Sequence, residues 1–175
     1  MSRPTTRTAG EVVPDPAPAD RFRHSELGGD IPFLLARARA STSGAANVAL
    51  EAVGLKVRAF SVLWLACEGL QPSQRELSEF LNLDPSQIVA LVDELEGRGA
   101  VTRQADPRDR RQRIITPTAA GRRLFRKAHA LAEAADDRSL SMLTADERRT
   151  LGELLVRVAL PAPDGPPGRL SGPGG

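Results

Sequence analysis

The stretch Asp106-Pro107-Arg108-Asp109-Arg110-Arg111 lies between two short apolar segments, Ala100-Val101-Thr102 and Ile114-Ile115. Two such segments on either side of a charged tip are typical of a β-hairpin, and Asp-Pro at the start of the tip favours a turn. The sequence therefore predicts a pair of antiparallel strands at 100–104 and 112–116, with a charged loop between them.

Positive charge is concentrated in this hairpin and just after it. Between residues 103 and 127 there are nine Lys or Arg residues and two Asp residues, whereas the whole chain has a net charge of only +2. A local excess of this size predicts a polyanionic partner at this surface. The alternative is a charged surface that is merely solvated, and the elements before the hairpin decide between the two.

Two short helices with clear start signals precede the hairpin. Ser73-Gln74-Arg75-Glu76 has the pattern of a capping box and predicts a helix over 73–80. Asp84-Pro85-Ser86-Gln87 combines an Asp N-cap with Pro at the first helical position, and predicts a second helix that ends at Gly97. Two helices joined by a tight turn form a helix-turn-helix, and the hairpin after them makes it a winged helix. The predicted fold class is mainly α with a small β-hairpin wing.

Four further helices are predicted from apolar residues at helical spacing and from N-cap residues. They are expected over 30–52, 57–68, 118–137 and 144–160. Residues 1–29 and 161–175 are rich in Pro and Gly without periodic apolar residues, and are predicted to be disordered tails. One domain is therefore expected over 30–160.

Composition narrows the class of protein. Cys67 is the single cysteine, so no disulfide can form within the chain. No apolar run approaches the ~20 residues that span a bilayer, and the N-terminus lacks the apolar region of a signal peptide. These features predict a cytoplasmic protein. Neither histidine is placed beside a nucleophile, and no pair of His and Cys residues has metal-ligand spacing, so neither an enzyme nor a metal or cofactor site is predicted.

The second helix of a helix-turn-helix can enter the major groove of DNA. Gln87 on its outer face can bond to adenine in a bidentate manner, Val89 can contact a thymine methyl group, and Ser86 can bond to a base or a phosphate. No Lys or Arg occurs between Asp84 and Glu96. Most of the affinity is therefore expected to come from the wing and from phosphate contacts.

Phosphate contacts are expected at the start of the first of these two helices, where the free backbone N–H groups of Ser73 and Gln74 can bind an anion. The wing arginines can reach an adjacent minor groove, and Asp109 can pair with Arg111 and fix its direction. The predicted DNA-binding residues are Ser73, Gln74, Arg75, Ser86, Gln87, Val89, Arg103, Arg108, Asp109, Arg110 and Arg111.

A pocket for a small apolar or phenolic effector is predicted near Phe60 and Trp64, which lie four residues apart on one helix. The competing interpretation is that both rings belong to the core, because the chain contains few aromatic residues.

Several of these segments resemble the MarR family of winged helix-turn-helix transcriptional regulators. The similarity extends over about 50–160 and rests on the following motifs: Gly54-Leu55, the helix 60–67, Ser73-Gln74-Arg75-Glu76-Leu77-Ser78, Leu91-Val92-Asp93-Glu94-Leu95-Glu96-Gly97-Arg98-Gly99, Asp106-x-Arg108-Asp109-x-Arg111 and Thr118-x-x-Gly121.

The resemblance implies a homodimer held by the first, fifth and sixth helices, which binds a pseudo-palindromic operator as a ligand-responsive repressor. It also implies that Arg111 enters the minor groove and that Asp109 orients it. Family members commonly have an Arg where this chain has Ala90, so the resemblance does not supply a major-groove cation. Two alternatives remain: a winged helix that binds proteins without specific DNA binding, and a thiol redox-sensing regulator that uses Cys67.

Overall fold

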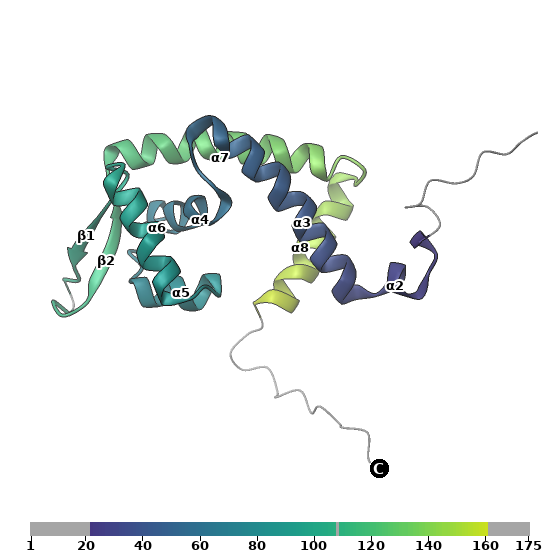
Figure 1. Cartoon of the computed structure of the whole chain (residues 1–175), viewed down its shortest axis with the longest axis horizontal. Coiled ribbons are helices and arrows are strands. Elements are labelled where there is room, and N and C mark those ends of the chain that lie inside the picture. Colours follow the sequence, from purple (N-terminus) through teal and green to yellow (C-terminus); the bar gives the residue numbers. More distant parts are fainter. Residues whose placement is uncertain (1–21, 108, 161–175) are drawn as a thin grey trace, which may run out of the picture. The chain divides into compact units, whose positions relative to one another are not determined.

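The computed structural model describes residues 22–107 and 109–160 (Figure 1). Arg108 and most of both predicted tails lie outside the described residues. The chain divides into two compact units, residues 1–41 and residues 42–175. This division falls inside the predicted 30–160 domain, within the helix α3 (Ile31–Leu50).

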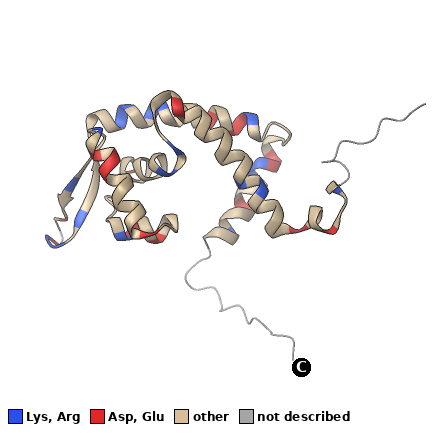
Figure 2. Ribbon diagram, in the orientation of Figure 1, with Lys and Arg blue, Asp and Glu red and all other residues tan. Residues whose placement is uncertain are grey.

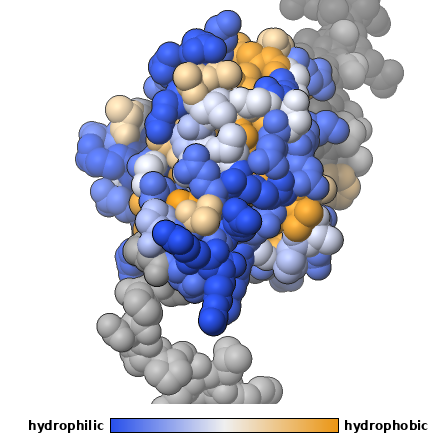
Figure 3. Space-filling model, turned by 90° about the vertical axis from the view of Figure 1, so that its left-hand side faces the viewer, coloured by the Kyte–Doolittle hydropathy of each residue, from blue (hydrophilic) through white to orange (hydrophobic). Residues whose placement is uncertain are grey.

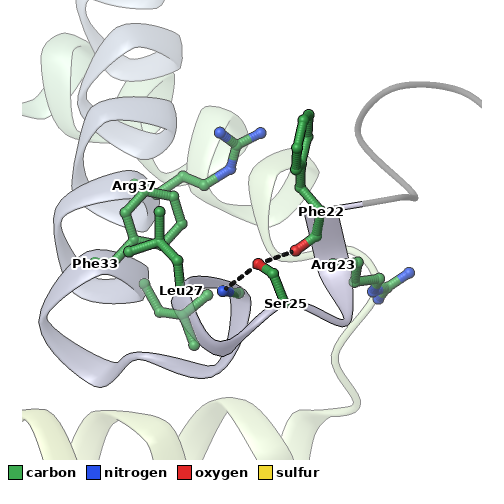
Figure 4. A pocket seen from close by; sticks show the side chains of 8 residues that line it. Phe22, Arg23, Ser25, Leu27, Phe33 and Arg37 are labelled. Carbon is green, nitrogen blue, oxygen red and sulfur yellow. Dashed lines mark hydrogen bonds between the residues drawn. The ribbon is translucent and has the colours of Figure 1, made fainter.

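The described part of the first unit contains helical structure before residue 30, within the segment predicted as the N-terminal tail. Ser25 caps the short helix α2 (Glu26–Gly29): its Oγ accepts a hydrogen bond from the Gly28 N–H at 3.1 Å and donates one to the Phe22 carbonyl at 2.7 Å (Figure 4). Asp30 caps α3 as predicted, because its Oδ2 accepts from the Phe33 N–H at 2.9 Å.

An open hollow of about 570 Å³ lies within this unit. Phe22, Leu27 and Phe33 line it together with Arg23 and Arg37 (Figure 4). Phe33 is half-buried, whereas Phe22 and Leu27 are exposed, so the Ser25 cap is the contact that accounts for the helical turn of α2.

The second unit contains the predicted helix-turn-helix and wing. The ends of its helices and strands agree with the sequence prediction to within two residues. The elements after α3 are the 3₁₀ helix η1 (Glu51–Val53), the helices α4 (Val57–Cys67), α5 (Gln74–Leu81) and α6 (Pro85–Gly97), the strands β1 (Val101–Ala105) and β2 (Arg113–Pro117), and the helices α7 (Ala119–Ser139) and α8 (Ala145–Ala159).

The core of this unit is aliphatic and is organised around α4, which packs against α6, α7 and β2. Burial of these side chains is the main stabilising contribution, at roughly 25 cal/mol per Å² of apolar area removed from water. The largest fully buried side chains are Leu50, Leu55, Val62, Leu63, Leu77, Ile88, Val92, Leu95, Val101 and Ile115.

Local capping defines the starts of α5, α6 and α8, as predicted. The Ser73 and Glu76 side chains form the expected capping box at α5, and Thr144 and Glu147 form another at α8. Asp84 caps α6 by accepting from the Ser86 N–H at 2.8 Å. These bonds satisfy N–H groups that have no partner within the helix.

The wing is an antiparallel hairpin in which Val101 pairs with Pro117 and Ala105 with Arg113. Both strands lie one residue later than predicted. The hairpin is attached to the helix-turn-helix just before α5, because the Ile115 N–H donates to the Pro72 carbonyl at 2.8 Å and Ser73 forms a bridge with Ile114.

The Thr118-x-x-Gly121 motif fixes α7 against the wing. The Thr118 Oγ1 donates to the Gly99 carbonyl at 2.6 Å and accepts from the Gly121 N–H at 2.9 Å. Gly121 is buried so closely against the residue before β1 that a Cβ atom placed on it would lie 1.9 Å from the Ala100 carbonyl oxygen. Only glycine allows this approach of helix and strand.

Gly121→Ala is therefore expected to lower the free energy of unfolding by about 2 kcal/mol or more, since the added methyl group meets backbone that cannot rotate away. Gly152→Ala is the matched control, because Gly152 lies in α8 with no atom within 4 Å of the added Cβ. That change is expected to stabilise the helix slightly. Urea unfolding measures both, and equal effects of the two substitutions would contradict the packing argument.

Candidate nucleic-acid interface

The helix α6 exposes the face that the sequence predicts. Ile88, Val92 and Leu95 are buried, whereas Gln87 is exposed and Val89 is 43% exposed. Both side chains are free to meet a base edge from the N-terminal half of the helix. Ser86 is also exposed, but its hydroxyl donates to the Asp84 carboxylate.

The bonds from Ser86 have an electrostatic consequence. Its hydroxyl and then its backbone N–H hold the pKa of the Asp84 carboxyl below its usual value. The carboxylate is therefore charged at neutral pH and keeps the Ser86 hydroxyl hydrogen. Ser86 can still accept a hydrogen bond through its oxygen, and its contact with a base or a phosphate stays a prediction.

The start of α5 is less open than predicted. The Ser73 backbone N–H donates to the Glu76 Oε2 at 2.7 Å, and Ser73 is buried. The N–H that was expected to contact a phosphate is thus already bonded within the capping box. Gln74 is half-buried, and Arg75 is exposed with its Nε 2.8 Å from the Glu79 Oε1.

Arg103 forms ion pairs within the protein. Its guanidinium bonds to both the Asp93 and the Glu96 carboxylates of α6, and its backbone N–H donates to the Glu96 Oε1 at 3.0 Å. Arg103, one of the predicted DNA-binding residues, thus connects the wing to α6. The N–H and then the guanidinium of Arg103 lower the pKa of Glu96, so this connection persists at neutral pH and weakens only as the pH falls through that lowered pKa.

The tip of the wing is shaped by Asp109. Its Oδ1 accepts from the Arg111 backbone N–H at 3.0 Å, and its carbonyl accepts from the Gln112 N–H at 2.9 Å. Asp109 thus holds the backbone of Arg111, whereas the sequence predicted a pair between Asp109 and the Arg111 side chain. Arg110 and Arg111 are both exposed. Arg108, also predicted to bind DNA, lies outside the described residues.

The exposed charge follows the predicted pattern within the second unit. Basic residues lie on the wing and on the first half of α7 (Figure 2). The face seen from the wing end is dominated by hydrophilic residues (Figure 3). An array of arginines on a hydrophilic face is suited to a phosphate backbone.

Arg98 is a structural residue that sequence reasoning did not identify. Its guanidinium donates to the Val53 carbonyl at 2.7 Å and also to the Gly54 carbonyl, and it lies 3.8 Å from the Glu94 carboxylate. Arg98 therefore fastens the end of α6 to the segment that enters α4. Its carbonyl partners lie more than forty residues away in the sequence, so no local pattern predicts these two bonds.

The rings of Phe60 and Trp64 are brought together, with centroids 5.3 Å apart. Phe60 is only 5% exposed and belongs to the core, whereas Trp64 is 36% exposed. Sequence reasoning missed the two other rings of this cluster, Phe125 and His129, whose centroids lie 5.7 Å and 4.7 Å from that of Trp64.

Trp64 lines two open hollows. One, of about 290 Å³, lies between α4 and α5 and is also lined by Leu65, Glu68, Phe80 and Leu81. At the edge of this hollow, the Trp64 indole N–H donates to the Glu68 Oε1 at 2.8 Å. The other, of about 200 Å³, is lined mainly by residues of α7.

Cys67 is half-buried at the end of α4. Burial raises the pKa of its thiol, and the nearby charges of Arg122 and Arg126 oppose that shift without reversing it. A reactive redox cysteine needs a lowered pKa, so this environment does not favour the redox-sensing alternative.

Two other kinds of site do not occur within the described ranges, 22–107 and 109–160. No group of three or more His, Cys, Asp or Glu side chains there is arranged to hold a metal ion. No helix there is long and apolar enough to cross a membrane.

The chain is similar to known proteins in sequence and architecture. Residues 55–112 match the sequence model of the MarR family. The transcriptional repressor Rv2887 of Mycobacterium tuberculosis is 32% identical over 134 residues, which cover 75% of this chain and 96% of the repressor.

Two solved structures extend the comparison. CouR from Rhodococcus jostii RHA1, bound to p-coumaroyl-CoA, is 44% identical, with a TM-score of 0.73 over 79% of this chain and 98% of CouR. Rv2887 in complex with DNA is 29% identical, with a TM-score of 0.61 over 74% of this chain and 97% of Rv2887.

Proposed function

The chain belongs to the MarR family of transcriptional regulators, and we propose that it is a repressor that binds a pseudo-palindromic operator as a homodimer and responds to a small aromatic effector. The observation that carries this proposal is the exposed face of α6 held beside an arginine-tipped wing by Arg103. Its site of action would be the cytoplasm, where the DNA of a bacterium lies.

The geometry supports two kinds of groove contact. Gln87 and Val89 project from the N-terminal half of α6, where a recognition helix meets base edges in the major groove. Arg110 and Arg111 lie exposed at the wing tip and can enter the adjacent minor groove, where the narrow groove attracts a guanidinium. The complex of the relative Rv2887 with DNA supports the same use of the fold here.

A second copy of the chain is the partner that α8 requires. Within the described chain no residue of α8 is buried, and a row of its large apolar side chains is exposed. An apolar face of this kind is normally covered by another protein surface. We propose that α3, α7 and α8 form the dimer contact. The exposed apolar residues of α8 are Leu151, Leu154, Leu155, Val156 and Val158.

The hollow between α4 and α5 is the site we propose for the effector. Its walls are mostly apolar, with Trp64 and Phe80 as aromatic surfaces and Glu68 as a polar group at the edge. Pockets with this composition bind small aromatic ligands. The p-coumaroyl-CoA found in CouR supports an aromatic acyl group as the ligand class.

Selection of DNA fragments by the purified protein, followed by fluorescence anisotropy, tests this function. We expect two chains on each specific duplex by light scattering. Gln87→Ala is expected to weaken binding to the best site by about 1–3 kcal/mol, the scale of one bidentate base contact, with little change on random DNA. The protein-interaction alternative, which the lack of a cation on α6 motivates, would instead give no binding to any duplex at low salt.

Substitution of Asp109 is expected to change DNA affinity in the direction opposite to that expected from charge alone. Asp109→Ala removes the acceptor that holds the Arg111 backbone, so DNA binding should weaken although a negative charge is lost. Asp109→Asn keeps an oxygen at the same place and should bind at least as tightly as the original protein. If Asp109→Ala and Asp109→Asn both bind DNA more tightly than the original protein, and to the same extent, Asp109 is only a surface charge.

Trp64 is the only tryptophan of the chain, and its fluorescence reports on the proposed effector site. Addition of p-coumaroyl-CoA is expected to change this emission and to lower DNA affinity, while CoA alone, as the control, should change neither. If a panel of simple phenols and p-coumaroyl-CoA leaves both quantities unchanged, the effector does not bind at Trp64.

A further inference from the structure

The helix α6 carries acidic residues but no basic ones, which is unfavourable beside DNA. Between Asp84 and Glu96 there is no Lys or Arg, and Asp93, Glu94 and Glu96 are all acidic. Arginines outside the helix lie near all three of these carboxylates and offset their negative charge. Arg103 bonds to Asp93 and Glu96, and Arg98 lies 3.8 Å from Glu94. These pairs remove repulsion between α6 and phosphates, but they provide no net attraction.

A further cation lies beside the same helix, on α4. Arg58 lines an open hollow of about 240 Å³ together with Gln87, Ala90, Leu91 and Glu94 of α6. Gln87 and Ala90 are exposed residues of the face proposed to meet DNA. The hollow therefore opens beside that face. The short side chain of Ala90 leaves the flank of α6 clear, so the long side chain of Arg58 is not blocked there.

Arg58 is not committed to an acidic partner. It is exposed, and among the ion pairs of residues 22–107 and 109–160 none includes it. The acid that shares its hollow, Glu94, lies near Arg98 instead. Arg58 thus differs from Arg103 and Arg98, whose guanidinium groups bind the protein itself.

We propose that Arg58 contacts a DNA phosphate at the edge of the major groove entered by α6, and so supplies from α4 the positive charge that α6 lacks. The inference rests on the proposed function. A planar guanidinium suits a phosphate because it can donate two parallel hydrogen bonds. Since the contact is with the backbone, it contributes to the affinity for every sequence, whereas Gln87 contributes to the choice of sequence.

The salt dependence of DNA binding tests this role. Each phosphate contact contributes about 0.9 to the slope of log affinity against log salt, so Arg58→Ala should reduce the slope by about 1.8 for a dimer. Affinity at low salt should fall on the order of tenfold for each phosphate that is no longer bound, in equal proportion on the best site and on random DNA. Arg58→Lys should keep most of the slope, because it keeps the charge.

Arg23→Ala is the matched control. Arg23 is also an exposed arginine, but it lies outside α3, α7 and α8 and outside the residues proposed to contact DNA, so its loss should leave the slope unchanged. Arg58→Gln, which keeps most of the length of the side chain without its charge, replaces Arg58→Ala if urea unfolding shows that the alanine variant is unstable.

The possible results separate this inference from the function on which it rests. If Arg58→Ala and Arg58→Gln keep the original slope while Arg111→Ala loses affinity, the protein binds DNA but Arg58 does not contact it. A loss confined to the best site would show that Arg58 reads a base, which also overturns the assignment. Absence of DNA binding by the unaltered protein would overturn the proposed function itself.

Discussion

The shared ion pair of Arg103 with Asp93 and Glu96 is the interaction on which the proposed DNA-binding surface depends. A winged helix reads two grooves with two separate elements, so their spacing must be fixed before DNA arrives. Arg103 lies in β1 and both of its carboxylate partners lie in α6, and its backbone N–H adds a further bond to Glu96. The bridge between Ser73 and Ile114 ties the same hairpin to the start of α5. Preorganisation of this kind reduces the entropy cost of binding.

The fold was predictable where its determinants are local. Ser73, Asp84, Thr118 and Thr144 each satisfy backbone groups two or three residues away, so a short pattern reveals the helix that follows. The wing strands were displaced by one residue because strand ends depend on pairing across the hairpin. The helix α2 was not predicted because Ser25, which caps it, lies among polar residues and paired glycines. No periodic apolar pattern marks a helix there.

The sequence predicted a basic surface for DNA, but it did not predict the role of each arginine. A count of charge treats all of these arginines alike, yet Arg103 and Arg98 bind the protein's own carboxylates and carbonyls, while Arg110 and Arg111 stay exposed. These partners lie up to 45 residues away along the chain, beyond the reach of any local pattern. Conversely, no motif surrounds Arg58 in the sequence. It is placed beside the exposed face of α6 because α4 packs against α6. Only tertiary structure separates structural arginines from those available to a ligand.

The helix α4 connects the two proposed sites physically. Its first turn carries Arg58 beside α6, and its last turn carries Trp64 in the hollow shared with α5. A ligand shifts an equilibrium only by binding two conformations with different affinity. A ligand wedged between Trp64 and Phe80 satisfies that condition if α5 moves relative to α4, because its contacts then change with the movement. Since α5 packs against α6, such a movement would displace Gln87 relative to Arg58. A base contact and a phosphate contact that must be made together are sensitive to small changes in their separation, so a modest displacement is enough to weaken operator binding.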